Sequence, residues 1–477
     1  MSGAYLYGSN LQNANFDNAI LYGTNLKSTN LENASFKNAI LSGSTFRDAN
    51  LQNVNFNNAK LKNVELYKAG LTNTDFTSAD LTEANLCGGY LAYMKFDKTI
   101  FKNTDLHNAD LSFADLQTSI FENTNLVGVN LSNANLEKQN LQNLNLYAAN
   151  LYNANLDGVN LKDKDLTNAN LSGVDLSDKD LTGTILKGTD LTGANLSGVD
   201  LSDKDLTNAN LSGANLSDKD LTGTILKGAD LTDVVLPSDY SLSGNDFQKT
   251  IFDGINLSGK DLSESSLWDA SFKNTNLKNT NLSFADLRAV DFTKIKNKSL
   301  AGADLFDSSF AHSNLSGVDL TGATLGGNNF WKTNLSDQDF TAISNAIIRG
   351  AIFPEANLSN ANFEGISLFD NIIYKATADG DASSADRSLA ELTDRYFSQF
   401  NNKIAVGKDV IGNDLQIQFI YFNNFQDAEL PNVNFSNADL RFASFNSANL
   451  TNADLSGANL ANANLSGADL SGAILEG

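Results

Sequence analysis

The chain has 477 residues, a formal net charge of −23 and a pI near 4.4. Such acidity makes bare nucleic acid and anionic membrane surfaces poor partners. The single cysteine, Cys87, excludes an internal disulfide framework, and no cluster of Cys and His has metal-ligand spacing. We therefore expect no cofactor, no direct nucleic-acid binding and no membrane insertion.

The N-terminal stretch, MSGAYLYGSNLQNANF, has neither a basic region nor an apolar core of the kind found in signal peptides. No apolar run along the chain approaches the length of a membrane-spanning helix. We expect a cytoplasmic protein or a component of a virus particle.

A large apolar residue, called the centre below, recurs at every fifth position. Centres run unbroken from Leu6 to Leu236, continue with short interruptions from Leu242 to Ile373, and resume from Leu415 to Leu475. They make about 86 quintets in all. A period of five fits neither a helix nor a simple strand, so each quintet should be a short extended piece followed by a corner.

The phenylalanines indicate how many quintets close one coil. Phe16, Phe36 and Phe56 lie twenty residues apart, and the series continues to Phe96. Aromatic rings stack well when they lie above one another, so this spacing predicts four quintets per coil. Short corner insertions are expected near 237–241, 293–299 and 341–347.

The stretches ADLTEANLCGG and ANLSGADLSGAIL resemble the pentapeptide-repeat family. The resemblance covers about nine-tenths of the chain, and at this copy number it is highly specific. It implies an all-β fold, a right-handed quadrilateral parallel β-helix. At four quintets per coil, the chain would make about 21 coils.

The expected organisation has four parts. They are an uninterrupted solenoid (1–236), a continued solenoid with corner insertions (237–373), a non-repeat insertion (374–414) and C-terminal coils (415–477). The insertion should hold a loop, an amphipathic helix at about 384–400 and a possible hairpin. That helix either packs on the rod or docks a partner through its apolar face, made by Leu389, Leu392, Tyr396, Phe397 and Phe400.

The corner insertion FTKIKNKSL carries three lysines on a strongly acidic chain. Lys294, Lys296 and Lys298 form either a solvated loop or a contact for an acidic partner.

The position two before the centre, called the inner slot below, usually holds a small residue. Glutamine takes it at Gln139 and Gln338, and lysine takes it at Lys164, Lys179, Lys204, Lys219 and Lys260. A buried, unpaired ammonium group is too costly to keep. We expect each lysine to reach solvent or to pair with the aspartate that follows it, as a structural variation rather than a binding site.

Catalytic residues are not apparent. His107 and His312 occupy outward positions, and no partner base is evident for Cys87. The carboxylates recur with the repeat, as expected for a decorated surface rather than a tuned acid–base pair. The sequence therefore predicts no enzyme activity.

The favoured function is a rigid rod that acts as a structural scaffold or protein–protein interaction module in a larger assembly, for example as a virion or tail component. It would bind proteins or copies of itself through its coil ends or the 374–414 insertion. The family resemblance implies an alternative, an acidic DNA mimic that binds a topoisomerase such as gyrase. A further alternative is a receptor-binding or adhesive rod, with the insertion as its contact.

Overall fold

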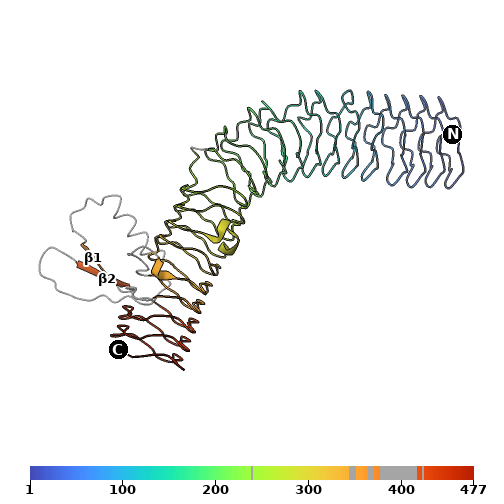
Figure 1. Cartoon of the computed structure of the whole chain (residues 1–477). Coiled ribbons are helices and arrows are strands. Elements are labelled where there is room, and N and C mark those ends of the chain that lie inside the picture. Colours follow the sequence, from blue (N-terminus) through green and yellow to red (C-terminus); the bar gives the residue numbers. More distant parts are fainter. Residues whose placement is uncertain (238–239, 343–350, 364–369, 376–415, 422–423, 477) are drawn as a thin grey trace. The chain divides into compact units, whose positions relative to one another are not determined.

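The computed structural model describes residues 1–237, 240–342, 351–363, 370–375, 416–421 and 424–476. The chain divides into two units. Unit 1 comprises Met1–Ser241 and Asp246–Ile255, and unit 2 comprises Leu242–Asn245 and Asn256–Gly477. Each unit is a stack of coils, visible as successive rungs in Figure 1.

One quintet makes one side of a coil, and its five positions have fixed tasks. The centre is buried, and its carbonyl oxygen accepts the N–H three residues later, as in Ala34 N to Leu31 O at 2.9 Å. The second residue after the centre has positive φ, which explains the frequent Gly and Asn there, for example Asn33. The residue before the centre pairs with the next coil in a parallel bridge, as Asn30 does with Asn50.

The Asn or Asp before the centre also stabilises the corner. Its side-chain Oδ1 accepts the N–H of the residue after the centre, as in Thr77 N to Asp75 Oδ1 at 2.9 Å. A hydroxyl at that next position adds a second bond, as in Thr192 Oγ1 to Asp190 Oδ1 at 2.7 Å. Asn and Asp favour this turn because their short side chains reach the backbone two residues on. Most of the acidic residues of the faces are therefore part of the turns.

Phenylalanine centres stack along the interior at the spacing that the sequence predicts. Phe56 lies 5.2 Å from Phe36 and 5.4 Å from Phe76 between ring centroids, with the rings close to parallel. Each buried centre stabilises the fold by about 2 kcal/mol, because its apolar surface is removed from water. The confirmed twenty-residue stacking means four quintets per coil in this part of the chain.

Short insertions leave the coil register intact in unit 2. Two 3-10 turns, η1 (Phe292–Lys294) and η2 (Lys296–Lys298), occupy the first, and η3 (Phe340–Ala342) begins the second. Phe330 still stacks on Phe353 at 5.0 Å, although 23 positions separate them. The three additional residues therefore do not disturb the stack of centres.

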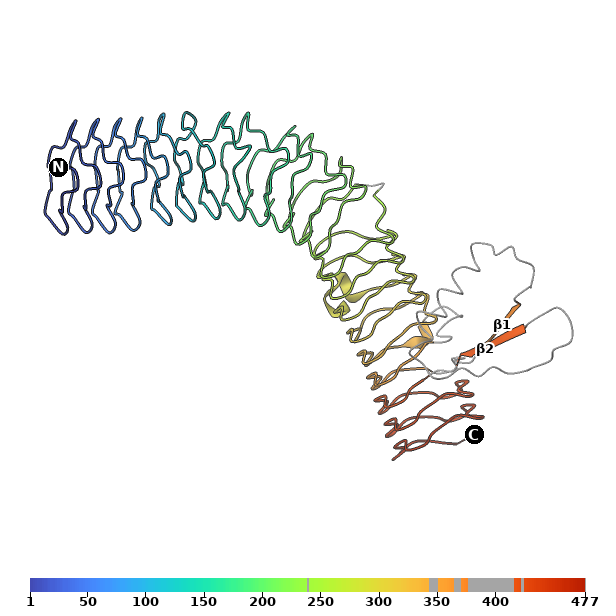
Figure 2. The ribbon, with the colours of Figure 1, turned by 180° about the vertical axis from the view of Figure 1, so that it is seen from behind.

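The long insertion is bypassed in the same way, but its bounds differ from those expected. Phe353 stacks on Phe425 at 5.0 Å. Strands β1 (Asp370–Lys375) and β2 (Gln416–Tyr421) pair antiparallel, with Asp370 opposite Tyr421 (Figure 2). Ile373 and Ile420, expected as centres, belong to these strands instead. In β2, Ile417, Phe419 and Tyr421 recur with the period of two that is typical of a strand. The expected helix at 384–400, with Leu389, Leu392, Tyr396, Phe397 and Phe400, lies outside the described residues.

In the second half of unit 1 the backbone ladder is complete on one side of the coils only. The hinge face is defined by unbroken bridges through Asn130, Asn150, Asn170, Asp190, Asn210 and Asp230. On the opposite side, the open face is defined by Asn140, Asn160, Asp180, Asp200 and Asp220. Among these described residues no bridge forms on the open face. The coils therefore fan apart about the hinge face.

The fan is not uniform, because two gaps are wider than their neighbours. In the first wide gap, between coils 141–160 and 161–180, bridges are absent on both flanking faces as well as on the open face. The second wide gap, between coils 181–200 and 201–220, has the same pattern. In the gap between them, both flanking faces are bridged, by Asp165 with Ile185 and by Asp175 with Asn195. The fan thus opens at intervals of two coils.

The bypassed insertion predicts a tolerated deletion. Removing residues 372–423 places Phe425 twenty positions after Phe353, the spacing of the undisturbed stack. We expect the shortened protein to keep its far-UV circular dichroism per residue and to lose less than about 5 °C in Tm. Loss of cooperative unfolding in the deletion variant would show that the insertion is part of the core.

Candidate functional site

Polar residues in the inner slot share one acceptor. Most of them donate to the carbonyl oxygen of a centre in the coil below, usually 23 positions earlier, as Thr74 Oγ1 does to Leu51 O at 2.9 Å. Thr333 repeats the bond to Phe310 O at 2.7 Å. This carbonyl already accepts its own turn N–H, and the slot donor supplies a second bond. A donor in the slot is therefore satisfied without solvent.

Gln139, Lys164 and Lys179 in the slot donate to the same kind of acceptor. Gln139 Nε2 donates to Leu116 O at 2.6 Å, and Lys179 Nζ donates to Leu156 O at 2.9 Å. Lys164 Nζ donates to Leu141 O, and the Gln142 and Leu144 carbonyls also lie within its reach. The Lys164 side chain is only 4% exposed, and burial lowers its pKa.

The expectation that each slot lysine reaches solvent or an aspartate is therefore wrong for Lys164. Its ammonium group is held by backbone carbonyl oxygens, which the sequence pattern alone did not indicate. Lys179, Lys204, Lys219 and Lys260 are half-buried. A ring of inward carbonyls thus provides a third way to accommodate a lysine inside the rod.

The lysine pairs coincide with the wide gaps. Lys164 and Lys179 belong to the coil above the first wide gap, and Lys204 and Lys219 to the coil above the second. In the same coils the hinge-face slots hold alanine, at Ala169 and Ala209. A lysine side chain is longer than the coil spacing of about 4.8 Å, so it holds the coils apart wherever it enters. The ammonium–carbonyl bonds offset part of the backbone pairing that is lost there.

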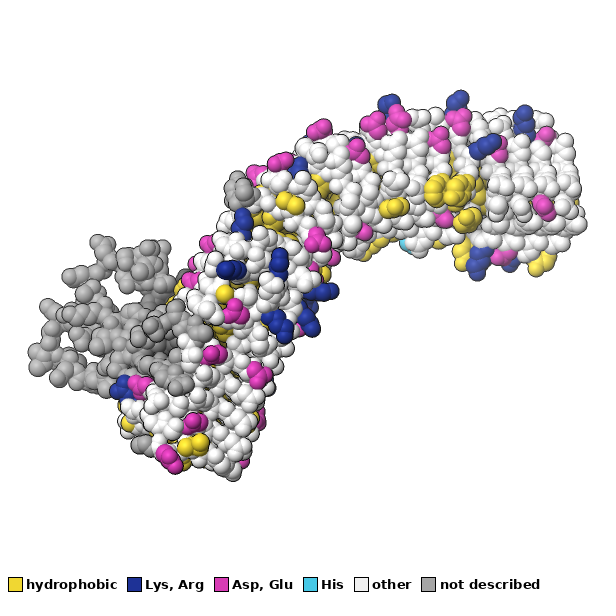
Figure 3. All heavy atoms as spheres, in the orientation of Figure 1, with side chains coloured by type: hydrophobic (Ala, Val, Ile, Leu, Met, Phe, Trp, Pro, Cys, Tyr) yellow, Lys and Arg dark blue, Asp and Glu magenta, His cyan; other side chains and the backbone are white. Residues whose placement is uncertain are grey.

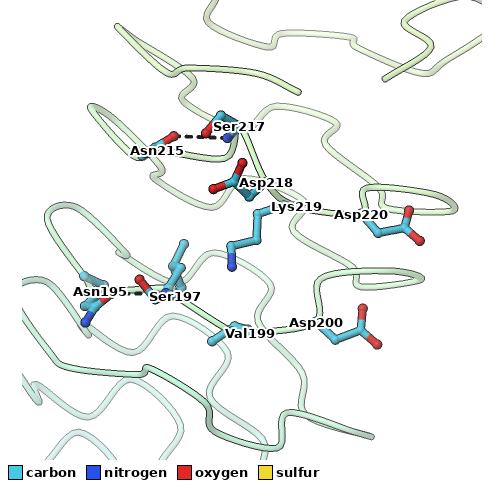
Figure 4. A pocket seen from close by; sticks show the side chains of 12 residues that line it. Asn195, Ser197, Val199, Asp200, Asn215, Ser217, Asp218, Lys219 and Asp220 are labelled. Carbon is cyan, nitrogen blue, oxygen red and sulfur yellow. Dashed lines mark hydrogen bonds between the residues drawn. The ribbon is translucent and has the colours of Figure 1, made fainter. Parts of the chain in front are cut away.

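A cleft of about 490 Å³ opens in the second wide gap. Residues 194–200 form one wall, and Asn215 and residues 217–220 form the other. Figure 4 shows the Lys219 side chain extending between the walls toward Ser197 and Val199. Hydrogen bonds from Thr182, and more weakly the charges of Lys162 and Lys204, lower the pKa of Asp180. The cleft is therefore polar, with an ammonium group inside and carboxylates at its edge.

The lysine corner is defined here as Lys294, Lys296 and Lys298, the residues that the sequence singled out. All three are exposed on η1 and η2, and Asn297 between them has φ of 57°. Basic side chains gather over this region in Figure 3. Lysines elsewhere form ion pairs from coil to coil, such as Lys102 with Glu122 at 2.7 Å. Within the described residues no such pair involves the lysine corner.

Groups with catalytic potential are held in structural contacts. His107 is half-buried rather than exposed, with Nδ1 2.9 Å from Val127 O, and His312 packs edge-on against Trp331. Burial, followed by the charge of Asp105, raises the pKa of the Cys87 thiol. Among the described residues no group of three His, Cys, Asp or Glu side chains is placed to hold a metal ion. None of the helices in those residues is long and apolar enough to cross a membrane.

One carboxyl group has a strongly shifted pKa. Burial raises the pKa of Asp307 to about 6, at a corner covered by the following coil. Its backbone N–H donates to Gly326 O at 2.7 Å. A Cβ at Gly327 would stand 2.7 Å from the Asp307 Oδ1, so glycine is needed for this approach.

Replacing both lysines of the first wide gap should close it. In Lys164→Ala/Lys179→Ala the slots become small, so the flanking faces should pair as they do in the next gap, and Leu146 N to Asp165 O and Leu156 N to Asp175 O should shorten to about 2.9 Å. A crystal structure of the variant measures both distances. Lys162→Ala, which changes a turn lysine of the same coil, should leave the gap open. A gap that stays open in the double variant would show that the lysine side chains do not hold the coils apart.

Replacing Asp307 with a neutral residue should increase the stability of the protein by an amount that depends on pH. Its folded pKa lies above the ordinary 3.8, so its contribution to stability is present below that pH and is lost as pH rises through about 6. Asp307→Asn should therefore stabilise the protein by about 1–2 kcal/mol at pH 7.5, after allowance for solvent screening, and by little at pH 4. Urea midpoints at both pH values measure this. Asp427→Asn, an exposed residue at the same turn position, should show no such difference, and an equal gain in both variants would refute the assignment.

Two family models match the chain. The model described as a pentapeptide repeat region matches residues 9–86 and 94–171. The model described as pentapeptide repeats (8 copies) matches residues 165–203, 205–236, 261–293, 303–341, 341–369, 424–457 and 438–477. No curated protein matches the chain.

Solved structures with this repeat are similar over parts of the chain. A pentapeptide repeat protein from the Arabidopsis thaliana thylakoid lumen is 24% identical, over 27% of this chain and 69% of its own, with a TM-score of 0.11. HetL from Nostoc sp. strain PCC 7120, involved in heterocyst differentiation regulation, is 21% identical over 88% and 90%, with a TM-score of 0.08. Full-length QnrB1, a plasmid-mediated fluoroquinolone resistance protein, is 16% identical over 52% and 92%, with a TM-score of 0.12.

Scores this low carry no argument about function. The family models match most of the chain, and the structure shows their repeat as stacked parallel coils. The chain belongs to the pentapeptide-repeat family, whose fold is a right-handed parallel β-helix.

Proposed function

We propose that this protein is a non-enzymatic rigid rod that serves as a scaffold or protein–protein interaction module in a larger assembly. The observation that carries the proposal is the register of the stack, which survives both short and long insertions. The ring centroids of Phe353 and Phe425 lie 5.0 Å apart although 72 positions separate the two residues. The distance between Phe330 and Phe353 is the same. A core that ignores insertions can present loops at fixed places on a rigid support.

The lysine corner is the contact we favour on this scaffold. Its three ammonium groups are exposed at one corner of a chain with net charge −23. Such a local reversal of sign attracts an acidic segment and disfavours basic partners, so it contributes specificity and association rate. The 374–414 insertion and the end coils are further proposed contacts, with partners or with other copies. The same scaffold would serve a virion, a tail or a cytoplasmic complex.

A second function, mimicry of DNA toward gyrase, is supported by the acidic faces. Hydrogen bonds from hydroxyl groups two residues on lower the pKa of face carboxyls such as Asp200 and Asp220, so these groups stay charged to a lower pH than an ordinary aspartate. Many of the same positions hold neutral Asn, and Lys162 and Lys227 pair with nearby carboxylates. The charge is therefore diluted, which makes this the weaker proposal. Inhibition of DNA supercoiling by gyrase at micromolar protein would reverse that order.

Charge reversal at the corner tests the scaffold proposal. Lys294→Glu/Lys296→Glu/Lys298→Glu should abolish a specific cross-link that the wild-type protein forms in its source cells, with the loss read out by mass spectrometry of cross-linked peptides. The matched control reverses three paired lysines, Lys27→Glu/Lys62→Glu/Lys102→Glu, and should keep that cross-link. Light scattering of the protein isolated from its source measures whether it is part of an assembly. Free, monodisperse rods without any partner would overturn the proposal.

The further alternative, an adhesive rod, has its own test. Deletion of residues 372–423 should then abolish binding to the receptor-bearing surface while the coils remain folded. Retained binding would exclude the insertion as its contact.

A further inference from the structure

Two nearly identical coils of unit 1 hold their lysines in different ways. Residues 161–180 read LKDKDLTNANLSGVDLSDKD, and residues 201–220 read LSDKDLTNANLSGANLSDKD. They differ at three positions only: Lys162 against Ser202, Val174 against Ala214, and Asp175 against Asn215. Each coil stands above a wide gap and carries its lysines in the same two slots. The lysine-bearing walls of the two gaps are therefore almost the same, whereas the coils below them, 141–160 and 181–200, differ at most positions.

In the first wide gap both lysines are latched to the coil below. Lys164 Nζ is held by the Leu141 and Gln142 carbonyl oxygens, and Lys179 Nζ by Leu156 O at 2.9 Å. The corresponding acceptors in the second wide gap would be Leu181 O and Leu196 O, 23 positions before each lysine. Among the described residues neither Lys204 nor Lys219 makes that bond. Lys219 instead extends through the cleft (Figure 4).

Both arrangements leave the hinge face intact. Leu151 N donates to Asn170 O at 2.7 Å across the first wide gap, and Leu191 N donates to Asn210 O at 2.8 Å across the second. Passage from one arrangement to the other breaks no hinge-face bond. In this passage each ammonium group gives up its hydrogen bond to a carbonyl oxygen and gains contacts with water and carboxylates. The two kinds of interaction contribute similar net free energies. Since nearly the same lysine-bearing coil adopts both, we expect the two arrangements to be accessible to Lys204 and Lys219 at a small cost in free energy.

We infer that the second wide gap is a compliant joint controlled by Lys204 and Lys219. When both ammonium groups bind the carbonyls of Leu181 and Leu196, the gap is latched like the first. When they turn to the carboxylates at the edge, the gap is free to open and narrow about the hinge face. Those carboxylates belong to Asp200, Asp218 and Asp220. The joint would let a scaffold adjust its curvature in one plane while its other coils stay in register.

Spin labels on one corner of the coils test the joint. In a Cys87→Ser background, one labelled pair is Ser177→Cys/Ser217→Cys, which spans the second wide gap. The matched pair, Asp157→Cys/Ser197→Cys, spans the first. Each pair crosses one wide and one closed gap, so a rigid stack gives the two pairs the same distribution. We expect the first pair to show a distance distribution about twice as wide as the second, or two distances.

The lysine variants decide the cause. Lys204→Ala/Lys219→Ala should collapse the Ser177→Cys/Ser217→Cys distribution to one short distance and leave the other pair unchanged, which also reports that the protein is folded. Lys187→Ala/Lys227→Ala, which changes turn lysines outside the slots, should alter neither. Equal, narrow distributions in the two wild-type pairs would overturn the joint. So would a broad distribution that survives the loss of Lys204 and Lys219.

Discussion

Backbone pairing between successive coils sets the spacing to which everything else in this protein conforms. Parallel strands pair at about 4.8 Å, so each inner slot receives a space one coil high. Alanine fills that space without touching the pairing. Threonine and serine fit and donate to the centre carbonyl below, as Thr74 does to Leu51 O. Where all slots of a coil hold side chains of this size, as between the two wide gaps, the hinge face and both flanking faces keep their bridges.

Lysine exceeds that space, and the consequence spreads beyond its own side of the coil. Because a coil is a closed ring of four sides, separation at two slots lifts three sides, and the fourth acts as the hinge. Lys164 and Lys179 lie on such a coil, with Ala169 at the hinge. The length of a side chain in the slot therefore determines how strongly the stack of coils curves at that point. The aspartates beside the lysines remain charged, so the same coils also keep the acidic surface on which partner choice depends.

Much of this architecture could be predicted from the sequence, because each position of the repeat has the same structural role in every quintet. Period five gave the centres, and the spacing from Phe36 to Phe56 gave the coil. The fate of Lys164 could not be predicted, because nothing in the pattern shows that centre carbonyls point inward. The strands β1 and β2 were missed for a different reason: isoleucines at the repeat interval masked the period-two alternation in QIQFIY. Of the candidate contact residues, Lys294, Lys296 and Lys298 lie in the described part of the chain, and the apolar residues expected on the 384–400 helix lie outside it.

One side of the fan has lost its backbone bonds from coil to coil, while the opposite side keeps them. Hydrogen exchange of the backbone amides in the wild-type protein tests this directly, because both sets belong to buried centres of the same coils. The amides of Leu141, Leu161, Leu181 and Leu201 on the open face should exchange at least about 100-fold faster than those of Leu151, Leu171, Leu191 and Leu211 on the hinge face. Equal protection on the two faces would contradict the account.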